Sequence, residues 1–78
     1  MIVTVLASGS KGNCIYISTN NHHILIDVGM TCISIERKLK EINVNPSDID
    51  TILVTHAHKD HIAGLDVFYK KYKPTVYL

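Results

Sequence analysis

The sequence predicts an α/β fold built on a mixed sheet, with the element order β-β-β-α-β-α-β. Three observations lead to this prediction. Short runs rich in Ile and Val cover residues 2–7, 14–19 and 22–28 and favour three strands at the start of the chain. The apolar period then changes to helical spacing, twice. Each helical stretch is followed by a further compact apolar run, which is typical of a covered strand.

The first three strands are separated by turn-forming residues. A cluster rich in Ser and Gly, residues 8–13, follows the first strand. Asn20 and Asn21 follow the second, and because asparagine tolerates a positive φ, they favour a tight hairpin turn. Gly29 ends the third strand. Hairpins followed by alternating strands and helices imply a sheet with both antiparallel and parallel neighbours.

Two stretches predict helices. In the first, Thr31 suits the N-cap, apolar side chains recur at positions 32, 35, 39 and 42, and Asn45-Pro46 ends the pattern. In the second, they recur at positions 62, 65, 69 and 72, and Pro74 ends the pattern. The apolar runs 51–55 and 75–78 are expected to be strands of the same sheet.

Composition bounds the class of protein. A chain of 78 residues is at most one domain, and 46% hydrophobic residues fit a folded chain. The net charge of +1 argues neither for nor against a nucleic-acid partner. No apolar run approaches the roughly 18 residues that span a bilayer, and no basic leader precedes residues 1–7, so a cytoplasmic location without membrane contact is expected. Cys14 and Cys32 are expected to be reduced and buried.

The motif that carries chemistry follows the run 51–55 and reads Thr-His-Ala-His-Lys-Asp-His over residues 55–61. Its candidate metal ligands are His56, His58, Asp60 and His61. Alternation puts the first two histidines on one side, and the last two ligands can point at a second position. Imidazole and carboxylate together suit zinc, and also manganese or iron. A random shuffle of this composition gives the pattern with a chance of about 10^-3. The alternative is a polar loop whose histidines cap the second helix.

Together these residues resemble the metallo-β-lactamase superfamily. The motif His56-x-His58-x-Asp60-His61 after an apolar strand is similar to the metal-binding signature of that superfamily, and Ile24-Leu-Ile-Asp-Val-Gly29 is similar to its earlier motif. The opening Leu6-Ala-Ser-Gly-Ser-Lys-Gly-Asn13 is similar to the YycJ/WalJ branch, which is associated with exonuclease activity. The resemblance implies the αββα sandwich of the superfamily, with residues 1–78 as an incomplete N-terminal part of a single domain.

The resemblance also implies roles for the motif. His56 and His58 would hold one metal ion, and Asp60 and His61 a second, with Asp60 also catalytic. The cofactor would be one or two divalent ions, with zinc the first choice and manganese the second. A water or hydroxide between the ions would be the nucleophile, because bound metal lowers the pKa of water to about 7.

Three further residues receive roles on the same basis. Asp27 would hydrogen-bond a ligand histidine from behind and so fix its orientation; the alternative is an ordinary turn aspartate at a strand end. Ser10 and Asn13 are candidate substrate contacts, because their loop has two glycines and polar groups that suit a phosphate. The alternative for that loop is a plain hairpin connection.

The expected function is a metal-dependent hydrolase that, when complete, acts as a phosphodiesterase or exonuclease on nucleic acid, with DNA as the expected substrate. Two metal ions need about six ligand contacts, and the motif offers four, so the segment alone is not expected to be active. One alternative keeps the fold and hydrolyses small esters or thioesters. A second alternative is a truncated remnant without enzymatic activity. The sequence leaves the native metal and the oligomeric state open.

Overall fold

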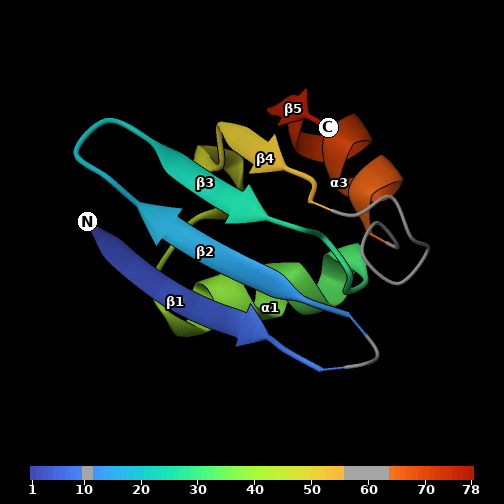
Figure 1. The fold of residues 1–78 in the computed structure, drawn as a ribbon, viewed down its shortest axis with the longest axis horizontal. Helices are drawn as coiled ribbons and strands as arrows, with labels where there is room; N and C mark the ends of the chain where they lie inside the picture. Colours follow the sequence, from blue (N-terminus) through green and yellow to red (C-terminus); the bar gives the residue numbers. More distant parts are fainter. Residues whose placement is uncertain (10–11, 56–63) are drawn as a thin grey trace.

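A computed structural model describes residues 1–9, 12–55 and 64–78 of the chain. Strands and helices follow one another in the predicted order, which confirms the α/β class (Figure 1). The strands are β1 (Ile2–Ala7), β2 (Cys14–Ser18), β3 (His23–Ile26), β4 (Thr51–Leu53) and β5 (Thr75–Tyr77). The helices are α1 (Cys32–Glu41), the short 3-10 turn η1 (Pro46–Asp48) and α3 (Leu65–Tyr72).

The sheet is mixed, as the sequence predicts. Its strand order is β1-β2-β3-β4-β5; the first three strands pair antiparallel, and β3, β4 and β5 pair parallel. Because β3 and β4 run in the same direction, their carboxyl ends meet at one edge of the sheet (Figure 1). At that edge the backbone N–H of Asp27 donates to the carbonyl of Leu53 over 2.8 Å.

Three connections differ in detail from the expectation. Strand β3 ends at Ile26 because Asp27 turns the chain with a left-handed φ of 63°. Strand β4 ends at Leu53, two residues earlier than expected. The hairpin between β2 and β3 forms without positive φ at Asn20 or Asn21; it is closed by Thr19, whose N–H donates to the carbonyl of His22 at 2.9 Å.

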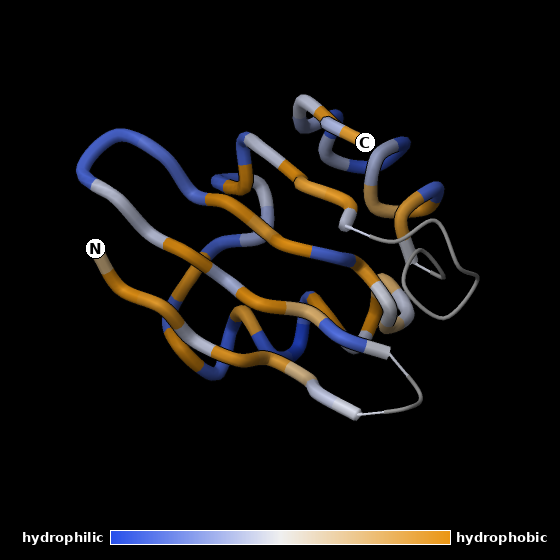
Figure 2. The backbone as a smooth tube through the Cα atoms, viewed as in Figure 1, coloured by the Kyte–Doolittle hydropathy of each residue, from blue (hydrophilic) through white to orange (hydrophobic). Residues whose placement is uncertain are grey.

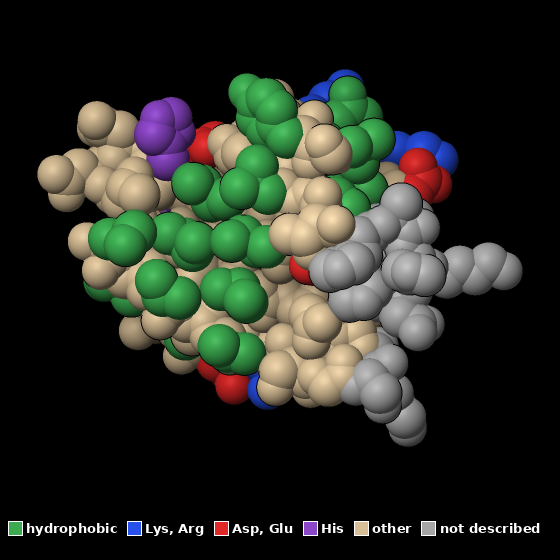
Figure 3. Space-filling model, in the orientation of Figure 1, with side chains coloured by type: hydrophobic (Ala, Val, Ile, Leu, Met, Phe, Trp, Pro, Cys, Tyr) green, Lys and Arg blue, Asp and Glu red, His purple; other side chains and the backbone are tan. Residues whose placement is uncertain are grey.

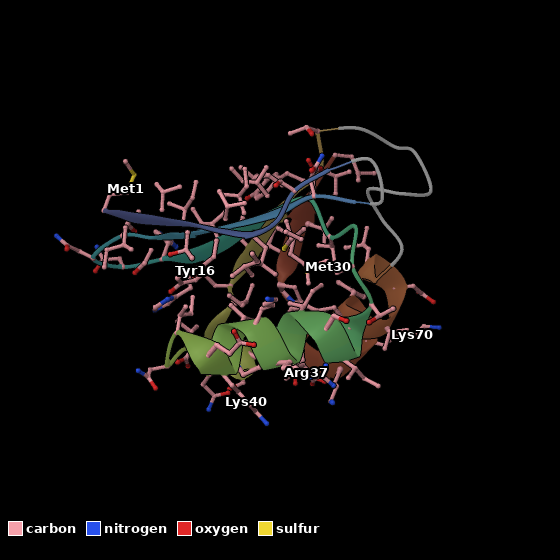
Figure 4. The ribbon with its side chains drawn as sticks, turned by 90° about the horizontal axis from the view of Figure 1, so that it is seen from below. Met1, Tyr16, Met30, Arg37, Lys40 and Lys70 are labelled. Carbon is pink, nitrogen blue, oxygen red and sulfur yellow. The ribbon has the colours of Figure 1, made fainter. Side chains whose placement is uncertain are left out.

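Helices α1 and α3 cover the same face of the sheet (Figure 4). Thr31 is the N-cap of α1, and its hydroxyl accepts from the N–H of Ser34 at 3.2 Å, as predicted. Hydrophobic and hydrophilic residues alternate along α1 with its turns (Figure 2). The buried hydrophobic residues form one cluster: Leu6, Cys14, Tyr16, Leu25, Val28, Cys32, Ile35, Leu39, Ile49, Ile52 and Phe68. No helix in the described ranges is long and apolar enough to cross a bilayer.

The opposite face of the sheet is apolar and open (Figure 3). The strand register gives two rows of side chains on this face, because paired residues of a sheet point the same way. The apolar members of the rows are Val3, Ile17 and Ile24, and Val5, Ile15, Ile26, Leu53 and Tyr77. Val3 is 56% exposed and Val5 59%. We call these eight residues the open sheet face.

Helices α1 and α3 are joined by a polar contact at Glu36. The Lys71 ammonium donates to Glu36 Oε2 at 2.6 Å, and the Tyr72 hydroxyl donates to the same oxygen. These two hydrogen bonds lower the pKa of the Glu36 carboxyl, with Lys71 the larger cause. The contact therefore fixes α3, the helix that follows the histidine motif, against α1.

This contact predicts a pH-dependent stability. Because the pKa of Glu36 is lower in the folded state than its ordinary value of about 4.3, its contribution is fully present above that value and is lost as the pH falls through the folded pKa. Below about pH 5 the wild type should lose unfolding free energy as Glu36 becomes protonated. The Glu36→Gln variant lacks this carboxyl and should lose less. Urea denaturation at several pH values measures it, with Glu41→Gln at an exposed position of α1 as the control. Parallel pH profiles of wild type and Glu36→Gln would contradict the assignment.

Candidate metal centre

The structure describes residues around the predicted metal ligands, and we call four of them, Asn13, Asp27, Thr55 and Gly64, the frame. The ligands themselves, His56, His58, Asp60 and His61, and the candidate substrate contact Ser10 lie outside the described residues. The residues that flank the motif, Thr55 and Gly64, are described, as are Asp27 and Asn13.

Asp27 fixes the residue that precedes the motif. Its carboxylate Oδ1 accepts from the backbone N–H of Thr55 at 2.8 Å, and Oδ2 accepts from the Thr55 hydroxyl at 2.6 Å. Asp27 is only 6% exposed, so the two hydrogen bonds replace water that the carboxylate loses on burial. The first residue after β3 is thereby tied to Thr55, one position before His56.

Asn13 joins the loop after β1 to the same edge of the sheet. Its side-chain Oδ1 accepts from the N–H of Gly9 at 3.1 Å, and its backbone carbonyl accepts from the N–H of Gly29 at 3.0 Å. The side-chain oxygen of Asn13 therefore shapes its own loop, whereas the amide nitrogen is the group that can donate to a ligand.

Gly64 is fixed by the connection between β3 and α1. Its N–H donates to the carbonyl of Val28 at 3.1 Å, and its own carbonyl accepts from the N–H of Phe68 at 3.0 Å as α3 begins. Asp27 and Val28 are adjacent, so one short stretch contacts both flanking residues. Sequence reasoning assigned no role to Thr55 or Gly64; their positions immediately before His56 and three residues after His61 were the available signal.

A pocket of about 360 Å³ opens beside this frame. Its apolar lining comes from the open sheet face and from Ala7, and its polar lining comes from Ser8, Asn13, Asp27 and Thr55. The pocket thus combines a hydrophobic floor with a few polar groups, which is the usual composition of a small-molecule or substrate site.

Cys14 lies near Asp27 but does not have the properties of a metal ligand. Burial, and then the negative charge of Asp27, raise the pKa of the Cys14 thiol to about 12. A thiol must lose its proton to bind a metal, so this cysteine remains a protonated core residue. Cys32 is also a buried free thiol, which confirms the expectation for both cysteines.

The remaining histidines lie at the other end of β3. His22 Nδ1 is 3.3 Å from Asp50 Oδ1, and His23 Nδ1 is 2.6 Å from the Tyr16 hydroxyl. Across the described parts of the chain, no three His, Cys, Asp or Glu side chains form a group that suits a metal ion. In the described structure, His22 and His23 instead contact Asp50 and Tyr16.

The donor set of the motif suits a divalent ion by its chemistry. Three imidazoles and one carboxylate are ligands that zinc accepts, and manganese accepts them too. The four residues follow Thr55, and Asp27 holds Thr55 at the carboxyl end of β4. Sites in α/β sheets commonly lie at this end of the strands.

Comparisons with known proteins agree with this arrangement. Residues 7–78 match the family model described as the metallo-beta-lactamase superfamily. The chain is 45% identical over 74 residues to exodeoxyribonuclease WalJ of Streptococcus pneumoniae serotype 2 (strain D39) and equally to exodeoxyribonuclease YycJ of Bacillus anthracis. Each match covers 95% of this chain and 28% of the relative, so the chain spans less than a third of the length of these curated relatives.

A solved structure shows the same fold. The class B3 di-zinc metallo-β-lactamase LRA-12, from an Alaskan soil metagenome, superposes with a TM-score of 0.76 at 23% identity. The match covers 82% of this chain and 25% of the other. The resemblance predicted from the motifs is thus confirmed, including its YycJ/WalJ branch. On the extent of the family match, this chain belongs to the metallo-β-lactamase superfamily of hydrolases.

Proposed function

We propose that these 78 residues are the N-terminal part of a metal-dependent phosphodiesterase that degrades DNA as an exonuclease. The observation that carries the metal-dependent chemistry is the anchoring of Thr55 by Asp27 directly before the histidine motif. The nucleic-acid substrate is supported by the names of the relatives WalJ and YycJ. Two buried free thiols support a cytoplasmic location, where cysteines stay reduced.

In this proposal His56, His58, Asp60 and His61 hold one or two divalent ions, zinc in the first place. The bound ions would polarise the phosphodiester and lower the pKa of a water molecule to about 7. Asp60 is a ligand and the catalytic carboxylate.

The frame residues orient the ligands and the substrate. One lone pair on each carboxylate oxygen of Asp27 accepts a hydrogen bond from Thr55. The second lone pair on each oxygen can accept a hydrogen bond from a ligand histidine. Asn13 lines the adjacent pocket, and its amide nitrogen can donate to a phosphate oxygen of the substrate. Ser10 belongs to the same loop and is proposed as a second phosphate contact.

We further propose that the open sheet face is covered by a second sheet from the remaining part of the domain. The relatives WalJ and YycJ are more than three times as long as the matched stretch. In the described residues, both helices lie on the other face. The eight apolar side chains of the open sheet face, in two rows, would otherwise face water, which is costly and promotes association.

The metal ligands predict a loss of both metal and activity on mutation. The test protein is a chimaera in which these 78 residues replace the matching stretch of the pneumococcal exodeoxyribonuclease WalJ. We expect metal-dependent release of nucleotides from DNA ends, and no hydrolysis of small esters. His58→Ala should lower metal affinity by more than the roughly 100-fold that outer positions reach, measured by metal content and nuclease assay.

The control for this experiment is His22→Ala, an exposed histidine at the other end of β3 that contacts Asp50. It should leave metal content and nuclease activity unchanged. Equal metal content in the His58→Ala and wild-type chimaeras would refute the ligand assignment. Ester cleavage without nuclease activity would favour the alternative substrate class.

If the Asp27–Thr55 contact orients the metal ligands, substitutions at Thr55 should change metal affinity according to whether they keep the hydroxyl. Thr55→Val keeps the shape of the side chain and removes the hydroxyl that donates to Asp27 Oδ2. We expect metal affinity to fall by about 10-fold or more, because ligand orientation depends on such contacts. Thr55→Ser keeps the hydroxyl and should restore the affinity, as measured by competition with a chromophoric chelator. If Val and Ser at position 55 bind metal equally well, the contact does not orient the ligands.

A charge on the open sheet face should have different effects on stability in the 78-residue chain and in the chimaera. Ile24→Lys places a charge on this face, which in the 78-residue chain should change the unfolding free energy by less than about 1 kcal/mol. In the chimaera the same lysine should abolish folding, because it would be buried between two sheets. Urea denaturation and soluble yield measure the two effects, with Ile33→Lys at an exposed position of α1 as the control. A well-folded Ile24→Lys chimaera would mean that no second sheet covers this face.

A further inference from the structure

We propose that Gly64 is a positioning residue of the metal centre, and that a glycine is required there because the backbone of the 27–30 segment occupies the space a side chain would need. This inference rests on the proposed metal-binding function of the motif. Gly64 is outside the proposed ligand set. It would act on the metal centre by fixing the position of the chain just after the histidine motif.

Backbone atoms crowd the Gly64 Cα atom. A Cβ atom built there would overlap the Met30 carbonyl oxygen and would lie 3.2 Å from both the Met30 carbonyl carbon and the Cys32 nitrogen. Real Cβ atoms essentially never approach another heavy atom within 3.0 Å. All three neighbours are backbone atoms, so a rotamer change cannot relieve the contact.

Backbone conformation does not explain the glycine. Gly64 has φ −96° and ψ −1°, a right-handed conformation that residues with side chains adopt. It is also the N-cap of α3, where it makes no side-chain capping hydrogen bond. Ser, Asp or Asn would cap the helix better. Gly9 is the opposite case, with φ +127° and nothing within 4 Å of an added Cβ. At position 64 the requirement is therefore space.

The surroundings offer little room for adjustment. Gly64 is fixed at its N–H by the carbonyl of Val28, whose side chain is fully buried. The segment that would have to move also carries Asp27, which holds Thr55. An added side chain would therefore separate Gly64 from the 27–30 segment or displace that segment. Either shift changes the relation between the two residues that flank the motif, and metal affinity is sensitive to such displacements.

The test compares Gly64→Ala with Ile35→Val, which shortens a fully buried side chain of α1 and supplies a matched loss of stability elsewhere in the core. Zinc affinity of the 78-residue chain is measured by chelator competition, and metal content is measured in the WalJ chimaera. We expect Gly64→Ala to lower zinc affinity by about 10-fold or more. Ile35→Val should retain wild-type affinity, although it lowers the urea midpoint.

Two outcomes would overturn the inference, for different reasons. If folded Gly64→Ala protein binds zinc as tightly as wild type, the residue does not position the centre, while the proposed function stands. If wild type binds no zinc in either protein, the proposed metal centre is wrong and this inference falls with it. Should Gly64→Ala unfold the isolated chain, the chimaera decides, because circular dichroism there separates loss of metal from loss of folding.

Discussion

The arrangement of this chain depends on one buried interaction, the pair of hydrogen bonds between the Asp27 carboxylate and Thr55. A carboxylate that is only 6% exposed has lost most of its hydration, so it must be satisfied by protein donors. A single residue, Thr55, which lies two positions beyond β4, supplies both donors. The end of β3 and the chain beyond β4 are thereby joined at the edge where the histidine motif starts, and losing the donors would leave a buried charge unpaired.

The short connection between β3 and α1 extends this constraint in both directions. The N–H of Gly29 donates to the carbonyl of Asn13 in the loop after β1. The carbonyl of Val28 accepts from the N–H of Gly64 at the start of α3. Three parts of the chain that are distant in sequence thus meet on residues 27–30. Binding sites need ligands whose supporting groups are fixed before the ion arrives, because ordering them on binding would weaken affinity. Here that support comes from two backbone hydrogen bonds and from the Asp27 side chain.

The two faces of the sheet have different roles. On one face, α1 and α3 bury the apolar cluster around Leu25, Ile35 and Phe68, and Glu36 fixes the two helices to each other. The other face is equally apolar and open, and the pocket beside Asp27 lies over its end. A small core on one face of a sheet is marginally stable, and in the proposed complete enzyme a second sheet would bury the open face.

The sequence by itself determined the elements and the superfamily: runs rich in Ile and Val predicted the strands, Thr31 the start of α1, and the histidine motif the superfamily. Local patterns sufficed because each depends on neighbours within a few positions. Only the tertiary structure decided that both oxygens of Asp27 bind Thr55, 28 positions away, and that Gly64 lies against the Met30 carbonyl. These contacts join residues whose spacing has no period, and a glycine or an aspartate in a sequence carries no mark of the backbone that will lie beside it.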